Sequence, residues 1–127
     1  MRDYLTTADV LGIHAVLLHS YGGGAGIRDL GSLESAAFRP QSGYYQDIVE
    51  EACALLESLL VNHPFVDANK RTAFAACAVF LRINGYRVAS DDATLYAVIL
   101  HWLALPAGER FATMLRDMRS MIENAKP

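Results

Sequence analysis

The sequence predicts an all-α fold, a compact single-domain bundle of about six helices, and three observations lead to this class. Apolar residues recur at helical spacing through most of the 127 residues. The alternation of apolar and polar residues that marks a half-buried strand is almost absent. Residues that favour helix ends flank the periodic segments. At this length we expect one domain over residues 1–127, with a hydrophobic core of its own.

The expected helices are defined by their ends as well as by their periodicity. A Ser, Thr or Asp stands before most of them, where its side-chain oxygen can accept a hydrogen bond from the first turn, and glycine or proline follows. The helices are expected at about residues 8–21, 33–38, 47–62, 69–85, 92–105 and 109–124. The residues expected to cap or end them are Thr6 or Thr7, Gly22, Ser32, Pro40, Pro64, Asp91 or Asp92, Pro106 and Gly108.

The third and fourth helices are expected to be buried to different degrees. The third carries a single apolar stripe, and its polar side should face away from the core. That polar side consists of Glu50, Glu51, Glu57 and Ser58. The fourth is apolar on nearly every side between Thr72 and Leu81, which is typical of a buried central helix. After it, residues 86–88 are expected to form a short extended segment.

Charge and composition exclude several classes of protein. The net charge of −3 argues against a nucleic-acid-binding protein that works through a broad basic face. We find no basic leader followed by an apolar stretch and no apolar run long enough to span a bilayer, so we expect a cytoplasmic protein. Cys53 and Cys77 lie in apolar helical segments and are expected to be buried free thiols, with a disulfide or a redox role as the alternative.

The most informative feature is the stretch at residues 63–71, which reads HPFVDANKR and falls between the third and fourth helices. Pro64 disfavours helical geometry at the preceding residue, so His63 should lie at the end of the third helix. Lys70 and Arg71 fall at the start of the next helix, where the partial positive charge of unpaired N–H groups disfavours cations. A bound phosphate would explain them, because helix N-termini and arginine side chains both bind phosphate.

The other side chains of this stretch have more than one interpretation when each is taken alone. His63 can accept a proton from an attacking hydroxyl group, or it can simply cap the helix. Asp67 can hold Mg²⁺ together with substrate phosphates, or it can cap the next helix, and Asn69 is equally ambiguous. Phe65 is expected to anchor the turn in the core. Together these residues favour transfer of a phosphorus-containing group from a nucleotide to a hydroxyl group.

Residues 63–71 resemble the signature of the Fic/Doc family, HPFx(D/E)GNGR, with Ala68 and Lys70 at two of its glycine positions. The Doc (death-on-curing) toxin branch shares both changes. The segment at residues 21–41, which contains GIRDLGSLESA, is similar to the N-terminal region of the family. The resemblance covers essentially the whole chain and implies the Fic-like fold.

This resemblance implies a toxin of a type II toxin–antitoxin module, with a Phd-like antitoxin as its partner. The toxin would transfer the γ-phosphate of ATP to a threonine hydroxyl of translation elongation factor EF-Tu and so block protein synthesis. His63 would be the general base and Asp67 would hold Mg²⁺. Asn69, Lys70 and Arg71 would bind the nucleotide phosphates, with Arg71 also counted among the catalytic residues. The rival interpretations are a protein adenylyltransferase, which transfers AMP, and a non-catalytic module that sequesters a partner.

Two further features have plainer explanations. The glycine-rich loop at residues 22–31 can be a flexible connector, although the resemblance suggests a flap that docks an extended stretch of the target protein. His14 and His19 are five residues apart, a spacing that does not suit a metal shared on one face of a helix.

Overall fold

Six helices dominate the structure, a computed structural model that describes residues 1–125. This confirms the predicted all-α fold class. The helices are α1 (Thr7–Tyr21), α2 (Leu30–Phe38), α3 (Ile48–Asn62), α4 (Asn69–Ile83), α5 (Asp92–Ala104) and α6 (Ala107–Met121). A 3₁₀ turn (Arg39–Gln41) follows α2, and two short strands complete the chain, β1 (Tyr86–Val88) and β2 (Ile122–Asn124).

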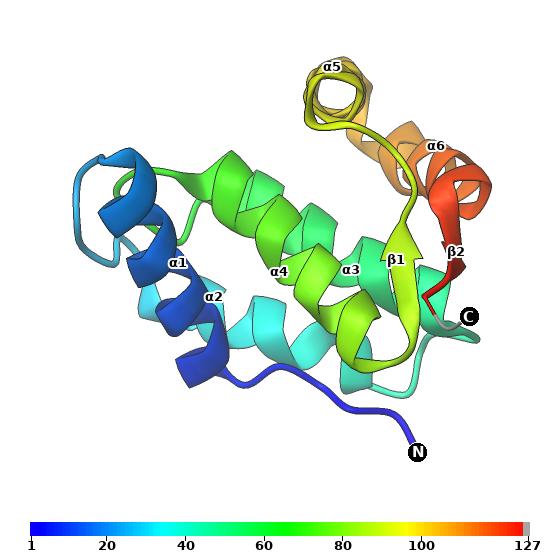
Figure 1. The fold of residues 1–127 in the computed structure, drawn as a ribbon, viewed down its shortest axis with the longest axis horizontal. Coiled ribbons are helices and arrows are strands. Elements are labelled where there is room, and N and C mark those ends of the chain that lie inside the picture. The colour runs from blue at the N-terminus through cyan, green and yellow to red at the C-terminus, as the bar shows by residue number, and fades with distance from the viewer. Residues whose placement is uncertain (126–127) are drawn as a thin grey trace.

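Helix α3 occupies the centre of the fold and packs against α2, α4 and α6. Figure 1 shows α1 and α2 on one side of the α3–α4 pair and the α5–α6 pair on the other. The prediction that the fourth helix would be the buried central one is wrong. Small side chains at Ala73, Ala76 and Cys77 bring α4 close to α3 on one side, whereas Val79 and Ile83 on α4 are exposed.

The polar side of α3 is covered rather than solvated, which corrects a second expectation. Glu51 and Ser58 are buried and Glu57 is half-buried. Each has a partner that offsets the loss of water, as buried polar groups require. Arg2 Nε donates to Glu51 Oε1 at 2.8 Å, and Arg39 Nη1 donates to Ser58 Oγ at 2.9 Å. Sequence periodicity alone gives no sign of these partners, because they come from distant segments.

Most helix ends follow the expected chemistry, with displacements at α2 and α6. Helix α6 begins at Ala107, so Gly108 lies inside it instead of breaking the chain before it. Thr6 caps α1, and its hydroxyl oxygen accepts a hydrogen bond from the Asp9 N–H while the Asp9 carboxylate accepts one from the Thr6 N–H. Asp91 caps α5 as predicted. Helix α2, however, begins three residues earlier than expected. Its cap is Asp29, whose carboxylate accepts the Ser32 N–H, so Ser32 lies inside the first turn.

The end of the last helix was also predicted wrongly. Helix α6 stops at Met121, and the next three residues form β2, which pairs antiparallel with β1. The Ala89 N–H donates to the Met121 carbonyl at 2.6 Å, and the Ala125 N–H donates to the Gly85 carbonyl at 3.0 Å. The apolar spacing continues through Ile122, so only the pairing with β1, a long-range contact, reveals the strand. The expected extended segment at residues 86–88 is confirmed as β1.

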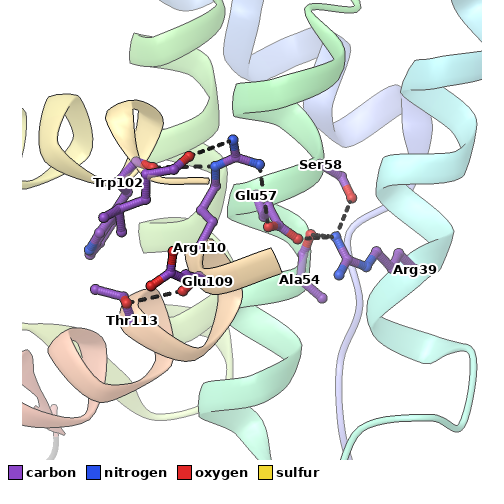
Figure 2. Close-up of polar contacts among 9 residues, drawn as sticks. Arg39, Ala54, Glu57, Ser58, Trp102, Glu109, Arg110 and Thr113 are labelled. Carbon is purple, nitrogen blue, oxygen red and sulfur yellow. Dashed lines mark hydrogen bonds and ion pairs between the residues drawn. The ribbon is translucent and has the colours of Figure 1, made fainter. Parts of the chain in front are cut away.

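A half-buried ion-pair cluster links the α5–α6 pair to the core (Figure 2). Glu57 on α3 lies between two guanidinium groups, with Oε1 at 3.0 Å from Arg39 Nη1 and Oε2 at 3.9 Å from Arg110 Nη1. Arg110 belongs to α6, and its Nε also donates to the Trp102 carbonyl on α5 at 3.3 Å. One carboxylate thus connects α3, α6 and the segment around the 3₁₀ turn.

The structure also bears on the two cysteines and on the possibility of a membrane-spanning helix. Cys53 and Cys77 are free and buried, as predicted, and burial raises the pKa of the Cys77 thiol to about 12. Thiols held protonated in this way are weak nucleophiles. No helix within residues 1–125 combines the length and the apolar character needed to cross a membrane.

Replacing Glu57 tests the ion-pair cluster. Glu57→Ala leaves two poorly solvated guanidinium groups without their carboxylate, so we expect the free energy of unfolding to fall by about 2 kcal/mol. The matched control is Glu123→Ala, which removes the exposed Arg87–Glu123 pair and should cost less than about 1 kcal/mol. Urea denaturation of both variants gives the two values. Equal losses would contradict the anchoring role of Glu57.

Candidate active site

Residues 63–71 form the turn between α3 and α4, and the turn borders an open cleft of about 920 Å³. Five of the six predicted site residues line this cleft. Its floor and walls come from α1, the following glycines, α4 and α5. The residues that line it are Leu17, Tyr21, Gly22, Gly23, His63, Val66, Asp67, Ala68, Asn69, Lys70, Arg71, Phe74, Ala75, Asp92, Leu95, Tyr96 and Ile99.

The sixth predicted residue, Phe65, lies beneath the turn. Its side chain is 1% exposed and belongs to the main core cluster. The ring stacks on the imidazole of His14 from α1, with centroids 3.8 Å apart and an angle of 5° between the planes. The turn is thereby attached to α1 as well as to the helices that it connects.

Two residues of the turn have backbone conformations that L-amino acids rarely adopt. His63 ends α3 with φ 46° and ψ 61°, and Ala68 precedes α4 with φ 64° and ψ 29°. Each left-handed residue without the freedom of glycine costs roughly 1–2 kcal/mol. Ala68 stands where the Fic signature has glycine, and its positive φ gives the physical reason for that preference.

The glycine-rich loop after α1 holds one side of the turn. Its extended part makes an antiparallel bridge, Ile27 with Phe65, and the Val66 N–H donates to the Gly26 carbonyl at 3.0 Å. The backbone N–H of Arg28 donates a hydrogen bond to the Pro64 carbonyl at 2.7 Å. The Arg28 guanidinium also donates to the His63 carbonyl at 2.6 Å, which satisfies an acceptor at the end of α3.

Asn69 holds the other side of the turn. Its Oδ1 accepts the Phe65 N–H at 3.0 Å, and its Nδ2 donates to the Phe65 carbonyl at 2.9 Å. Both ends of the amide are therefore used to close the turn. The structure places the Asn69 side chain in a shape-determining position, and its contact with phosphate stays a prediction.

Asp67 presents a carboxylate at the mouth of the cleft. Its Oδ2 accepts the Gly24 N–H at 3.0 Å and its Oδ1 accepts the Ala68 N–H at 2.8 Å. These two hydrogen bonds, the Gly24 bond foremost, lower the pKa of Asp67, and the charge of Arg71 adds to the effect. The carboxylate is exposed and has lone pairs to spare, so it suits Mg²⁺, which commonly takes one or two carboxylates together with waters and substrate phosphates.

The first turn of α4 lacks the side-chain cap that most other helices have. Ala68 occupies the N-cap position of α4 and makes no side-chain hydrogen bond, whereas α1, α2, α3 and α5 each have a Thr or Asp there. Lys70 and Arg71 lie in this turn, and neither takes part in an ion pair within residues 1–125. The Arg71 guanidinium lies over the Tyr21 ring, 4.7 Å from its centroid.

Three residues that shape the site were missed from the sequence. For His14 the sequence raises only the question of metal binding, although its spacing from Val10 and Leu17 places it on the inward face of α1. For Arg28 and Tyr21 the sequence offers only their place in the segment at residues 21–41 that resembles the family's N-terminal region. Their contacts with residues 62, 63 and 71 join parts of the chain more than 30 residues apart, so no local pattern could show them.

Fold and site together define the class of this protein, and comparisons with known proteins agree. A model of the Fic/DOC family matches residues 4–81, more than half of the chain, so the chain belongs to the Fic/DOC family. The toxin Doc of Mycolicibacterium smegmatis is 43% identical over 96 residues, which cover 72% of each chain. The protein kinase doc of Escherichia phage P1 is 33% identical over 89 residues, 67% of this chain and 71% of that one. The predicted resemblance to the Doc branch is confirmed.

Gly23 tests how tightly the loop packs on Asp67. A Cβ atom at this position would lie 2.9 Å from Asp67 Oδ2 and 3.0 Å from Leu18 Cδ2, and Gly23 has a φ of +124°. We expect Gly23→Ala to lower the free energy of unfolding by about 1–3 kcal/mol. The control Gly12→Ala, in open space on α1, should raise it by roughly 0.5–1 kcal/mol. A Gly23→Ala protein as stable as the wild type would show that the loop does not hold the carboxylate.

The lowered pKa of Asp67 predicts a pH-dependent effect of Asp67→Asn. A carboxyl group whose pKa is lower in the folded state stabilises the protein above its unfolded pKa of about 3.9 and loses this contribution as pH falls through the folded value. We therefore expect Asp67→Asn to be less stable than the wild type at pH 7. The difference should shrink below about pH 4. Urea denaturation of both proteins at pH 7 and below about pH 4 measures the difference in stability. A difference that does not depend on pH would contradict the lowered pKa of Asp67.

Proposed function

We propose that this protein is a toxin that transfers the γ-phosphate of ATP to a threonine hydroxyl of EF-Tu. One observation carries the proposal. The uncapped first turn of α4, where Lys70 and Arg71 form no ion pair with any of residues 1–125, lies in the same cleft as His63 and Asp67. Two relatives support it, because one is a Doc toxin and the other is a protein kinase by name.

The proposed reaction needs a base beside the phosphate site. His63 has an exposed side chain at the rim of the cleft, where a hydroxyl group of a target protein can reach it. The imidazole accepts the hydroxyl proton while the hydroxyl oxygen forms a bond to the γ-phosphorus. The bond between that phosphorus and the oxygen bridging the β- and γ-phosphates breaks, and ADP leaves. The proton remains on His63 until solvent removes it.

Charge neutralisation supplies most of the remaining catalysis in phosphoryl transfer. Arg71 can hold phosphate oxygens with two parallel donors, and Lys70 adds a compact charge. The unpaired N–H groups of the first turn of α4 extend this anion site. Asp67 would hold Mg²⁺, which neutralises the charge that develops on the phosphate oxygens.

The position of Lys70 favours phosphate transfer over AMP transfer. A glycine at this position, as in the Fic signature, leaves room and bare N–H groups for the phosphate that is attacked when AMP is delivered. Lys70 narrows that space and adds charge, so that the terminal phosphate is presented to His63 instead. The same base would serve AMP transfer, and this is the alternative that an experiment has to exclude.

The partners proposed here follow from the relatives and the family resemblance. EF-Tu is the proposed substrate, and a Phd-like antitoxin is the proposed partner that blocks the cleft. Both would place the protein in the cytoplasm. A small open reading frame for a DNA-binding antitoxin beside the gene would support this pairing.

Labelled ATP separates the three interpretations. We expect purified protein, EF-Tu and Mg²⁺ to transfer the label of γ-labelled ATP but not that of α-labelled ATP, with a mass gain of one phosphate on EF-Tu. Transfer of α-label would establish the adenylyltransferase, and no transfer with persistent toxicity would establish the sequestering module.

Substitution of the base supplies the control. His63→Ala should lower the transfer rate by about 10²–10⁴-fold while the protein stays folded. His101→Ala, a second exposed histidine outside the cleft lining, should not change the rate. A folded His63→Ala protein that remains as toxic as the wild type would rule out catalysis as the cause of toxicity.

A further inference from the structure

His14 is a buried polar residue that the proposed reaction does not use. It lies on α1, some 50 positions from the turn in sequence, and only 5% of its surface is exposed. Besides stacking on Phe65, its Nε2 lies 3.0 Å from the backbone carbonyl oxygen of Asp67. A carbonyl oxygen can only accept a hydrogen bond, so Nε2 must carry the proton in this contact.

This hydrogen bond fixes the direction of one peptide plane in the site. The Asp67 carbonyl points to α1, so in a trans peptide the Ala68 N–H points the opposite way. There it donates to Asp67 Oδ1 at 2.8 Å. A half-turn of this peptide would change the φ of Ala68 and allow the residue to leave the left-handed region. An alanine backbone favours that change, because negative φ is less crowded.

The turned-over peptide would harm a phosphate site. It would direct a carbonyl oxygen, instead of an N–H group, toward the carboxylate of Asp67 and the first turn of α4. An oxygen with partial negative charge repels both the carboxylate and a phosphate. The orientation held by His14 is therefore the one that suits an anion, although it is the costlier one for Ala68.

We infer that His14 is a positioning residue for the transfer reaction, whose Nε2–H group holds the Asp67–Ala68 peptide with its N–H directed to the Asp67 carboxylate. The effect on the rate rests on the proposed function. The peptide orientation itself does not, because it can be measured without nucleotide or target protein.

Solution NMR of the wild-type protein tests the orientation first. The ¹⁵N shifts of the His14 ring should show the tautomer protonated at Nε2. Ala68 should show the strong NOE between its own amide and α protons that a positive φ produces. A ring protonated at Nδ1 alone, or a weak NOE at Ala68, would overturn the inference regardless of any activity.

Two substitutions separate the hydrogen bond from the stacked ring. His14→Phe keeps a ring on Phe65 and removes the donor, whereas His14→Gln keeps an N–H donor and removes the ring. We expect His14→Phe to weaken the Ala68 NOE and to lower the transfer rate about five- to thirtyfold, the factor that corresponds to the left-handed preference. His14→Gln should retain more of both signals. A larger loss of rate and of the Ala68 NOE in His14→Gln than in His14→Phe would show that the stacked ring, and not the hydrogen bond to the peptide, supports the site.

Rescue by glycine gives a readout that simple destabilisation would not. Glycine adopts positive φ without penalty, so residue 68 no longer needs the hydrogen bond from His14 once it is glycine. We therefore expect His14→Phe to lower the transfer rate less in the Ala68→Gly protein than in the wild type. Absence of rescue in a folded double variant would overturn the inference. A wild-type protein that transfers no phosphate would instead reject the proposed function, and the NMR result would still decide the role of His14.

Discussion

The turn between α3 and α4 is held in a conformation that its own residues disfavour. His63 and Ala68 are the two non-glycine residues with positive φ within residues 1–125, and both border the cleft. Neither would keep this geometry in an isolated peptide, where nothing offsets the steric cost. In the folded chain the turn is fixed from α1 by His14, from the glycine-rich loop by Arg28, and from α4 by Asn69. The site thus exists only as a product of tertiary structure.

The contacts that fix the turn are made mostly through its backbone, and this leaves the side chains of His63, Lys70 and Arg71 out of the contacts that hold the turn. The carbonyl groups of His63, Phe65 and Asp67 accept from Arg28, Asn69 and His14 in turn. Within residues 1–125, the His63 imidazole and the charged groups of Lys70 and Arg71 take part in no ion pair. A site whose dipoles are already oriented does not have to reorganise when charge moves during a reaction.

Sequence reasoning predicted the fold class, most helix ends and the residues that gather in the candidate site, because these depend on local chemistry. The caps at Thr6 and Asp91 and the break at Pro64 are read from neighbouring residues, and the HPFVDANKR stretch is contiguous. It failed where partners are remote. Periodicity could not show that α3 buries Glu51, or that the chain after Met121 pairs with β1. His14 was missed for the same reason, since its role appears only once Phe65 and Asp67 lie against it.

The pairing of β2 with β1 has a consequence for the dimensions of the cleft. One wall comes from α5, through Leu95, Tyr96 and Ile99, whereas the floor comes from α4. Strand β1 precedes α5 and strand β2 follows α6, so the pairing of the two strands brings together the two ends of the α5–α6 segment. The ion pair between Glu57 and Arg110 attaches this segment to α3. The width of the cleft therefore depends on the β1–β2 pairing and on the contacts of Glu57, which lie away from residues 63–71. Related sequences could change that width there without altering the turn.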